Sequence, residues 1–360
     1  MKTKIAFLIS TLGTGGAEKQ LIRTINLLNK NKYEIKLFVL TSVNDLKSEL
    51  DNEIPVTYFN LTSYANPLSH LKIFKAIRDY NPAIVHSVMY ASNLFARIYK
   101  IFSPKVKVIN HIHGLGSWIK KPHILLDRSL LKYVDKFIVV SQMSKTLRLE
   151  REKYPDLKVK VVYNCVNTDI YHPGHIEKNN SEIVVGIACR LIKLKNVSYI
   201  IELVKEIQEL GLNIKLKIAG DGPEKDNLMN LVNKYNLSNK VHFLGLVKKM
   251  PEFYREIDCF VLSSHIEDLP LSIVEALSTG KAFIASNVGG IKELTMNTKS
   301  MLFDLESPIQ ENANKIKEFI NNLDFSEPIL QNRKFVQDNF SENVHKKKLE
   351  IIYNELTKPV

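Results

Sequence analysis

Short apolar runs alternate with amphipathic segments along most of the chain. Apolar runs at 5–10, 35–40, 84–86 and 106–110 are separated by segments with helical spacing of apolar residues, as at 68–79 and 91–101. Buried parallel strands read as continuous apolar runs, and helices connect them. The alternation resumes at 183–188 and continues through 216–219, 241–244 and 259–262. The pattern therefore predicts an α/β protein with two doubly wound, Rossmann-like domains.

The length of 360 residues agrees with two domains. We predict a first domain over 1–170 and a second over 171–335, joined by the polar stretch that begins at His172 and carries Pro173 and Gly174. The last segment, 336–360, follows separately. Apolar residues recur at roughly helical spacing between Arg333 and Leu356, which predicts an amphipathic helix.

Apolar residues make up 45% of the chain, enough for two cores. The apolar run Ile5–Ile9 is too short for a signal peptide, and no run is long enough to span a bilayer. We therefore expect a cytoplasmic protein. Its three cysteines, Cys165, Cys189 and Cys259, are far apart and lack metal-ligand spacing, so we interpret them as ordinary buried thiols.

The net charge of +12 is unevenly distributed. Residues 1–170 hold 26 Lys and Arg against 13 Asp and Glu, whereas residues 171–360 hold 24 against 25. Such an asymmetry indicates an anionic partner for the N-terminal half, such as a phosphorylated substrate or an anionic membrane surface. Lys120 and Lys121 beside Trp118 form a basic and apolar patch of this kind, with a plain surface loop as the alternative. No nucleic-acid-binding motif accompanies the charge, so we exclude nucleic acid as a partner.

The stretch Ser263–Glu293 concentrates the candidate chemistry of the second domain. An apolar strand ends before Glu267 and Asp268, Pro270 opens a helix that carries Glu275, and Gly280 ends that helix. Carboxylates accept hydrogen bonds from sugar or ribose hydroxyls, and a helix N-terminus near Leu271 favours phosphate. The stretch predicts a ligand site at the carboxyl end of a strand.

The first domain offers a glycine-rich loop and histidines at strand ends. Gly13, Gly15 and Gly16 lie between the first strand and the helix that follows, where glycine permits positive φ and close approach of a ligand. His113 comes immediately after a strand and before Gly114, a position suited to function. His111 is interpreted as structural.

These motifs resemble the retaining glycosyltransferases of family 4, which have the GT-B fold. The resemblance rests on Glu267-x7-Glu275 followed by Gly-Gly-x-x-Glu, and on shorter matches along nearly the whole chain. These matches are the GGAE-like loop at 15–18, the strand end at 81–87, Ser141 with Lys145, Arg190 with Lys195, and the Gly-Asp-Gly-Pro turn at 220–223.

The resemblance implies two Rossmann-like domains that face a cleft, with the C-terminal helix crossing back to pack on the first domain. It implies a metal-independent hexosyltransferase without cofactor, which moves a sugar from a UDP- or GDP-sugar to an acceptor hydroxyl with retention. The acceptor expected is a lipid-linked glycan or oligosaccharide in bacterial surface-polysaccharide assembly, reached by peripheral contact with the inner face of the membrane.

The resemblance also implies roles for individual residues. His113 and Glu267 are the expected catalytic residues. Donor binding is expected from Gly16, Arg190, Lys195, Gly220, Leu271 and Glu275, and the acceptor side from Gly15, His86 and Lys120.

Some positions depart from the family pattern. Cys189 and Asn196 stand where glycines are usual around the Arg-Lys motif, and Cys165 and Asn167 alter the turn after the first domain. Asp268 replaces the glycine that commonly follows the first glutamate, and we expect it to affect donor-sugar preference.

Two alternatives remain open at this point. A sugar-nucleotide epimerase with the same fold would bind the donor but need no acceptor, and a non-catalytic binding protein would release no nucleotide. A nicotinamide-dependent enzyme is disfavoured, because Gly13-x-Gly15-Gly16 lacks the GxGxxG spacing.

Overall fold

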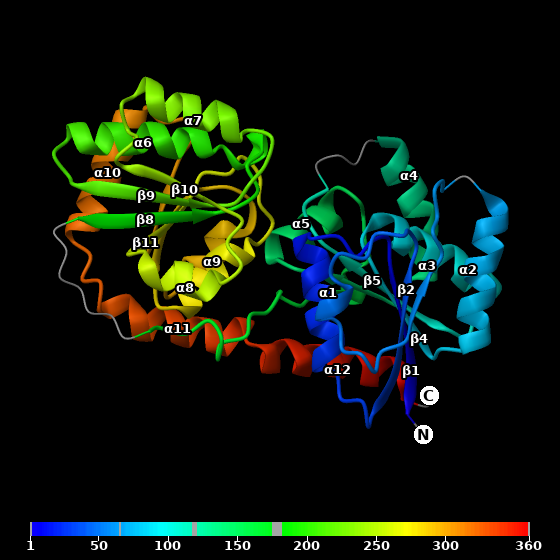
Figure 1. Ribbon diagram of the computed structural model, residues 1–360. Helices are drawn as coiled ribbons and strands as arrows, with labels where there is room; N and C mark the ends of the chain where they lie inside the picture. Colours follow the sequence, from blue (N-terminus) through cyan, green and yellow to red (C-terminus); the bar gives the residue numbers. More distant parts are fainter. Residues whose placement is uncertain (1, 65, 117–120, 175–181, 359–360) are drawn as a thin grey trace. The chain divides into compact units, whose positions relative to one another are not determined.

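The computed structural model describes residues 2–64, 66–116, 121–174 and 182–358. The chain divides into two compact units (Figure 1). The first unit comprises residues 1–164 and 343–360, and the second comprises residues 165–342.

The first unit is built on a seven-stranded parallel sheet with the order β3-β2-β1-β4-β5-β6-β7. Its strands are β1 (Thr3–Ile9), β2 (Tyr33–Val39), β3 (Val56–Tyr58), β4 (Ile84–Val88), β5 (Lys107–Ile112), β6 (Lys136–Val139) and β7 (Val159–Val161). Its helices are α1 (Gly16–Leu27), α2 (Pro67–Tyr80), α3 (Tyr90–Phe102), α4 (Lys121–Leu130), α5 (Gln142–Glu150) and α12 (Glu342–Thr357), with short 3₁₀ helices η1 (Lys47–Glu49), η2 (Leu131–Tyr133) and η3 (Asp156–Lys158).

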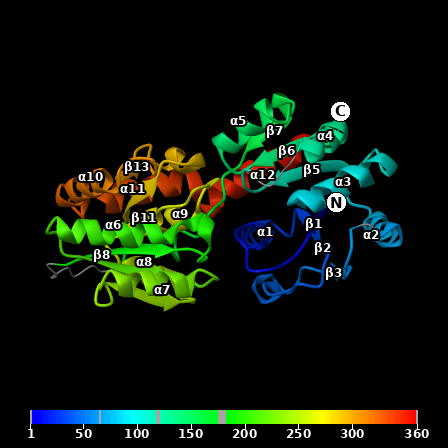
Figure 2. The same ribbon diagram turned by 90° about the horizontal axis from the view of Figure 1, so that it is seen from above.

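Helices cover both faces of this sheet. Alternate residues of β1 point to opposite faces, so Phe7 packs with α1 and α12 while Leu8 packs with α2 and α3. Figure 2 shows α1 and α2 on opposite sides of the strands β1 and β2. Because both faces are buried, the strands are apolar at successive positions, which explains the continuous runs in the sequence.

The second unit repeats this architecture on a six-stranded parallel sheet with the order β10-β9-β8-β11-β12-β13. The strands are β8 (Ile183–Ala188), β9 (Ile214–Ala219), β10 (Val241–Gly245), β11 (Cys259–Leu262), β12 (Ala282–Ser286) and β13 (Ser300–Phe303). The helices are α6 (Val197–Glu209), α7 (Lys225–Lys234), α8 (Met250–Glu256), α9 (Leu271–Ser278), α10 (Ile309–Asn321) and α11 (Glu327–Phe340), with η4 (Lys193–Lys195) and η5 (Gly289–Leu294).

Local sequence explains where several helices begin and end. Asn66 caps α2 by accepting a hydrogen bond from the backbone N–H of Leu68, Pro67 follows it, and Asn81 ends the helix in the left-handed conformation. Ser141 caps α5 in the same way, as the sequence predicts, with its hydroxyl 2.8 Å from the N–H of Ser144. Gly280 follows α9 with a φ of +77°.

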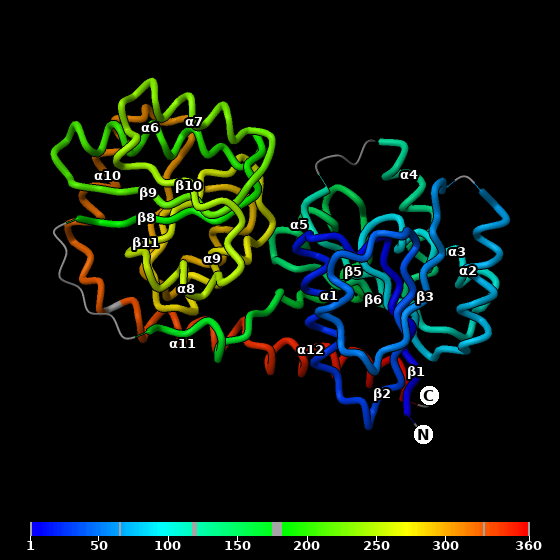
Figure 3. The backbone as a smooth tube through the Cα atoms, in the orientation of Figure 1, coloured from blue at the N-terminus to red at the C-terminus, as the bar shows by residue number. Residues whose placement is uncertain are grey.

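The C-terminal segment forms two helices rather than the single one expected. Helix α11 ends at Phe340 and α12 begins at Glu342, because Ser341 takes an extended conformation and bridges to Val166. Figure 3 follows this end of the chain. Helix α12 packs on the first unit through Leu349, Ile352 and Tyr353, as the resemblance implied.

The boundaries between units also differ from the expected 170/171 and 335/336. The first lies between Asn164 and Cys165, since Val166 pairs with Ser341 and the carbonyl of Tyr171 accepts from Arg333. These contacts assign residues 165–171 and all of α11 to the second unit. Two parallel-sheet Rossmann-like domains confirm the predicted fold class. Among the described residues, no helix combines the length and apolarity needed to cross a membrane.

Candidate functional site

The second unit gathers the predicted donor-binding residues at the carboxyl edge of its sheet. Arg190 follows β8, Gly220 follows β9, and Glu267 lies between β11 and α9. Strands β9, β8 and β11 are neighbours in the sheet, so the three loops meet at one edge. This edge is where open α/β sheets bind ligands.

Lys195 and Glu267 form an ion pair across this edge. The Lys195 Nζ lies 2.5 Å from Oε1 of Glu267, although the two residues are far apart in the sequence. The hydroxyl of Ser264 donates to the same carboxylate oxygen at 2.7 Å. One oxygen of Glu267 is therefore held by a cation and a hydroxyl, which fixes the direction of the carboxylate.

Backbone contacts hold the two loops that carry this pair. The hydroxyl of Ser263 donates to the carbonyl of Asn196 at 2.7 Å, and the N–H of His265 donates to the carbonyl of Leu194 at 2.9 Å. Asn196 has φ 50° and ψ 42°, a left-handed conformation that glycine and asparagine adopt most readily. The substitution of asparagine for the family glycine thus leaves the turn geometry available.

Arg190 is a cation at this edge without an ion pair to any described side chain. Its side chain is exposed, and in the described part of the chain its guanidinium makes no hydrogen bond or ion pair. A guanidinium in this position can bind an oxyanion with two N–H donors. Arg190 and Lys195 stand on the same connection, between β8 and α6.

Glu275 is held in place by a buried tyrosine. The Tyr254 hydroxyl of α8 donates to Oε2 of Glu275 at 2.8 Å, and Tyr254 is fully buried. Burial raises the pKa of Tyr254 well above its usual value, and the nearby Glu275 adds to the rise, so the phenol stays protonated and remains a donor. Leu271 is the first residue of α9. The backbone N–H groups in the first turn of a helix have no acceptor within the helix, so they are available to a ligand.

The backbone around residue 220 has room only for glycine. Gly220 has a φ of +146°, and a Cβ there would lie 1.8 Å from the carbonyl oxygen of Cys189. The need for glycine is thus structural, and contact with a donor stays a prediction. Burial raises the pKa of the Cys189 thiol to about 12, which agrees with its interpretation as an ordinary buried thiol.

In the first unit, the glycine loop does not use positive φ. Gly15 has a φ of −74°, contrary to the conformational role that the sequence suggests. The lack of a side chain at Gly15 instead leaves room for the carboxylate of Glu18. A Cβ added at Gly15 would lie 2.3 Å from Oε2 of Glu18. Nothing lies within 4 Å of the corresponding position at Gly16, which is exposed and open to close approach.

His113 follows β5, as expected, and stacks near His111 with ring centroids 4.4 Å apart. Burial and, to a smaller extent, the nearby His345 lower the pKa of His113 to about 3. At neutral pH its imidazole is therefore uncharged and acts as a hydrogen-bonding group rather than a cation.

His86 lies in the core and not on the acceptor-side surface predicted for it. It is fully buried in the central strand β4, where Nδ1 lies 2.7 Å from the Tyr353 hydroxyl and Nε2 lies 3.3 Å from Nδ1 of His111. Its side chain points to the sheet face covered by α12, so it has no path to a ligand. His111 is also buried, as expected. The acceptor-side prediction for Lys120 lies outside the described residues.

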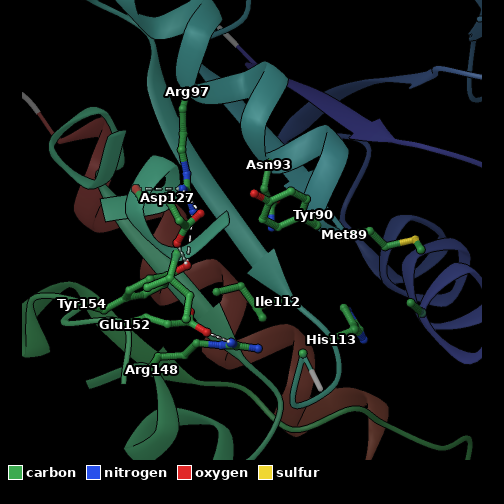
Figure 4. Close-up of a pocket in the computed structure, with 13 residues that line it drawn as sticks. Met89, Tyr90, Asn93, Arg97, Ile112, His113, Asp127, Arg148, Glu152 and Tyr154 are labelled. Carbon is green, nitrogen blue, oxygen red and sulfur yellow. Dashed lines mark hydrogen bonds and ion pairs between the residues drawn. The ribbon is translucent and has the colours of Figure 1, made fainter. Parts of the chain in front are cut away.

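The structure also shows a cavity that sequence reasoning missed. A cavity of about 150 Å³ lies in the first unit, next to His113, and two nearly buried ion pairs line it (Figure 4). Arg97 of α3 pairs with Asp127, whose other oxygen accepts from the Tyr154 hydroxyl at 2.6 Å. In the second pair, Arg148 of α5 contacts Glu152, which follows that helix.

These residues lie on three helices and a loop and form no spaced motif. Burial by itself would lower the pKa of Arg97, but Tyr154 and Asp127 outweigh it and leave the pKa raised, so the charge persists. In the sequence, only the four-residue spacing of Arg148 and Glu152 could have indicated one of these pairs. The same spacing of opposite charges is common on exposed helices, so it does not indicate a buried pair.

The backbone beside this cavity is strained. Met89, the residue before α3, has φ 72° and ψ 159°. This region is essentially restricted to glycine and costs on the order of 1–3 kcal/mol for other residues. Strain of this kind gathers at functional sites, and Met89 lines the cavity.

Comparison with protein families decides the identity of the chain. Residues 14–170 match the family described as Glycosyltransferase Family 4, and residues 172–334 match Glycosyl transferases group 1. The chain belongs to the family 4 glycosyltransferases of the GT-B type. It is therefore a glycosyltransferase, an enzyme of class EC 2.4, which removes the non-catalytic binder and the epimerase from the alternatives.

Similar proteins in other organisms are named as glycosyltransferases. An uncharacterized glycosyltransferase of Methanocaldococcus jannaschii is 32% identical over 275 residues, which cover 67% of this chain and 66% of that relative. A Campylobacter jejuni enzyme is 29% identical over 349 residues and 92% of both chains. It is named GalNAc-alpha-(1->4)-GalNAc-alpha-(1->3)-diNAcBac-PP-undecaprenol alpha-1,4-N-acetyl-D-galactosaminyltransferase.

Solved structures show the same fold. The crystal structure of Anabaena HepE in complex with UDP superposes with a TM-score of 0.84 at 20% identity, over 99% of this chain and all of that one. At this identity the likeness establishes the GT-B fold of the family.

Proposed function

We propose that this family 4 enzyme is a retaining, metal-independent glycosyltransferase that uses a UDP- or GDP-sugar as donor. The observation that carries the proposal is the arrangement of Lys195, Glu267 and Arg190 at one sheet edge, with the start of α9 beside Glu267. Two cations and a helix N-terminus suit a diphosphate, and carboxylates suit sugar hydroxyls. The UDP bound to Anabaena HepE supports a nucleotide-sugar donor.

Each residue then has a defined task. Arg190 and Lys195 stabilise the negative charge that develops on the departing diphosphate, helped by the amides at Leu271. Glu275, oriented by Tyr254, accepts from the ribose hydroxyls, and Glu267 accepts from the sugar. In the retaining reaction the acceptor oxygen forms a bond to the anomeric carbon on the face from which the diphosphate departs. The leaving phosphate oxygen takes the acceptor proton.

Metal independence rests on these cations. Within the described ranges, no group of three or more His, Cys, Asp or Glu side chains could hold a metal ion. In this proposal Arg190, Lys195 and backbone N–H groups stabilise the leaving group, because their positive charge and dipoles face the departing diphosphate.

Donor turnover tests the proposal. Thermal stabilisation and nucleotide release are measured across UDP- and GDP-sugars in the presence of a chelator, with and without a lipid extract. We expect one donor to stabilise the enzyme and nucleotide release to rise with the extract. Release that requires added divalent metal would contradict metal independence, and an inverted anomeric product would contradict retention.

The sugar preference of the donor site depends on Asp268 in this proposal. Asp268 is buried beside Glu267 and adds negative charge where the family commonly has glycine. We expect Asp268→Gly to change the ratio of kcat/KM values among donor sugars. An unchanged ratio would show that this residue has no part in selectivity.

We also propose a lipid-linked acceptor in bacterial surface-polysaccharide assembly, approached at the inner face of the membrane. The acceptor in the printed name of the Campylobacter relative, a PP-undecaprenol glycan, supports this class. The first unit supplies the physical basis, because it holds 30 Lys and Arg against 14 Asp and Glu. On α4 it also exposes Leu125 and Leu126 near Lys121 and Arg128. Exposed leucines beside cations are typical of helices that bind anionic membranes.

Liposome flotation tests the membrane contact. The Leu125→Ser and Leu126→Ser double variant should bind vesicles that contain phosphatidylglycerol more weakly than the unaltered enzyme. Leu330→Ser provides the control, because this leucine is more exposed than Leu125 and Leu126 but belongs to the second unit. Equal binding to neutral and anionic vesicles would contradict the electrostatic part.

A further inference from the structure

The cavity beside His113 lies at the carboxyl edge of the first sheet. It is bounded by the end of β5, by the start of α3 and, at Ala17, by the start of α1. Ala17 directly follows the open glycine loop at Gly16. The cavity therefore lies beside the glycine loop of this unit.

The charged residues that line the cavity form two pairs, Arg97 with Asp127 and Arg148 with Glu152. These four side chains are more than nine-tenths buried. The same oxygen of Glu152 also pairs with Arg151, which is partly exposed and lies outside the lining. A lining of paired charges offers no net attraction that would offset the loss of hydration of an anion, so a buried phosphate or carboxylate is disfavoured.

One hydrogen-bond donor in this lining has no acceptor. Nη1 of Arg148 pairs with Glu152, and Nη2 donates to the carbonyl of Gly114 at 2.9 Å. Its Nε is buried and has no hydrogen-bond partner among the residues that the structure describes. A buried guanidinium N–H is costly to leave unpaired, so the site suits one neutral carbonyl oxygen.

The rest of the lining is largely apolar. It includes Met89, Ile112 and Ile124, with the ring of Tyr90. Sites for drug-sized ligands occupy about 300–1,000 Å³, so a cavity of about 150 Å³ takes one substituent or part of one ring. A small planar group that carries a methyl and a carbonyl oxygen on the same carbon offers one apolar contact and one hydrogen-bond acceptor to this lining.

From this geometry we infer that the cavity binds the acetamido group of an N-acetylated sugar in the acceptor. The carbonyl oxygen accepts from Nε–H of Arg148, and the methyl group packs on Met89, Ile112 and Ile124. The inference rests on the proposed function, since it places the acceptor on the first unit. It adds the class of acceptor: a glycan whose accepting end carries an N-acetylamino sugar.

Saturation-transfer NMR on the full-length enzyme tests the inference directly. The probes are p-nitrophenyl glycosides of N-acetylglucosamine and N-acetylgalactosamine, each compared with the glucoside or galactoside that has a hydroxyl instead of the acetamido group. We expect the acetyl methyl protons to receive the strongest saturation. In transfer assays we expect the acetamido acceptors to be favoured by at least about tenfold, because one hydrogen bond and one methyl contact separate each pair.

Two variants separate the cavity from the rest of the surface. Ala17→Leu narrows the cavity mouth with a good helix former, and Lys19→Leu places the same side chain on α1 at an exposed position away from the cavity. Methyl saturation should disappear in Ala17→Leu and persist in Lys19→Leu. Arg148→Lys keeps a cation opposite Glu152 but removes Nε–H, and should lose the acetamido preference. If Arg148→Lys does not fold, the methyl saturation of Ala17→Leu still tests whether the acetamido group binds in the cavity.

The outcomes distinguish this inference from the proposed function. Equal saturation or transfer with hydroxyl and acetamido probes overturns the inference, as does binding that Ala17→Leu leaves intact. Absence of glycoside binding in an enzyme that still releases nucleotide from its donor also overturns it, while the proposed function stands. Failure to bind any donor overturns the proposed function, and the methyl saturation, which needs no donor, then decides the inference alone.

Discussion

The two units have the same architecture but present their candidate sites in opposite ways. In the second unit the site is an edge with an exposed guanidinium at Arg190 and an ion pair, Lys195 with Glu267. In the first unit the charged groups point inward, and Arg97 and Arg148 are almost completely buried. Local motifs mark the first kind of site, because loop geometry creates it. Only packing between distant helices creates the second kind.

The overall charges show the same contrast. The first unit holds 30 Lys and Arg against 14 Asp and Glu, whereas the second holds 20 against 24. The excess positive charge of the chain therefore lies on the unit whose interior already balances its own buried charges. An excess of surface charge attracts partners of opposite charge, whereas a buried charge needs a paired group to offset its loss of hydration.

The largest effect should come from breaking a buried pair in the first unit. Asp127→Ala leaves Arg97 buried without its carboxylate and also removes the acceptor of Tyr154. We expect a loss of about 3–5 kcal/mol in the free energy of unfolding. Urea unfolding, with hydrogen exchange to assign the loss to the first unit, measures it.

Asp156→Ala is the control for this prediction. Asp156 pairs with Lys145 in the same unit, but its side chain is mostly exposed. Removal of such a pair should change the free energy of unfolding by less than about 1 kcal/mol. Equal losses for the two variants would show that burial does not distinguish these pairs.

The next largest effect should be a difference between the two units in their stability at acidic pH. Burial lowers the pKa of His86 to about 3 and that of His345 to about 4, with nearby charged groups as smaller causes for each. The unfolded chain takes up protons near pH 6.5, while the folded unit keeps both rings neutral. Stability is therefore complete above about pH 6.5 and falls as the pH drops, by up to about 1.4 kcal/mol per pH unit for each ring.

Hydrogen exchange between pH 7 and pH 5 checks this prediction. Peptides from the first unit should lose protection at the lower pH. Those from the second unit should change less, because its described histidines, His172, His242 and His265, are exposed. A uniform loss of protection in both units would show that the buried histidines do not govern acid stability.

The turn at Gly220 is the point at which the second unit should be most sensitive. Gly220→Ala would place Cβ against the carbonyl of Cys189 in addition to the unfavourable φ, and we expect a loss of about 3 kcal/mol. Gly211→Ala is a matched control with a φ of +86° and no atom within 4 Å, and it should lose about 1 kcal/mol. Thermal unfolding of the two variants compares them, and equal losses would exclude the clash.

The smallest expected effect concerns Tyr254. Tyr254→Phe removes the hydroxyl that orients Glu275, at about 0.5–1.5 kcal/mol, so the Kd for the donor should rise by up to about tenfold. Tyr199→Phe removes a comparable bond, to Asn312 at 2.7 Å, and should leave donor affinity unchanged. Calorimetry with the donor that the turnover screen identifies distinguishes the two variants.

Prediction from the sequence succeeded where a site depends on neighbouring residues. Ser141 as a helix cap and Gly280 after α9 follow from local backbone chemistry, and the structure has both. Prediction failed for His86, because a histidine near a strand end can point to either sheet face. Its orientation depends on Tyr353, far away in the sequence.

The sequence by itself determined two doubly wound domains and the residues that meet at the carboxyl edge of the second sheet. Periodicity and motifs are sufficient there, because parallel strands bring their loops to one edge whatever the details of packing. Tertiary structure alone decided the cavity beside His113, the partners of Arg97 and Arg148, and the unit to which α11 belongs. Burial and pairing of these side chains depend on contacts between distant segments, which a local pattern does not encode.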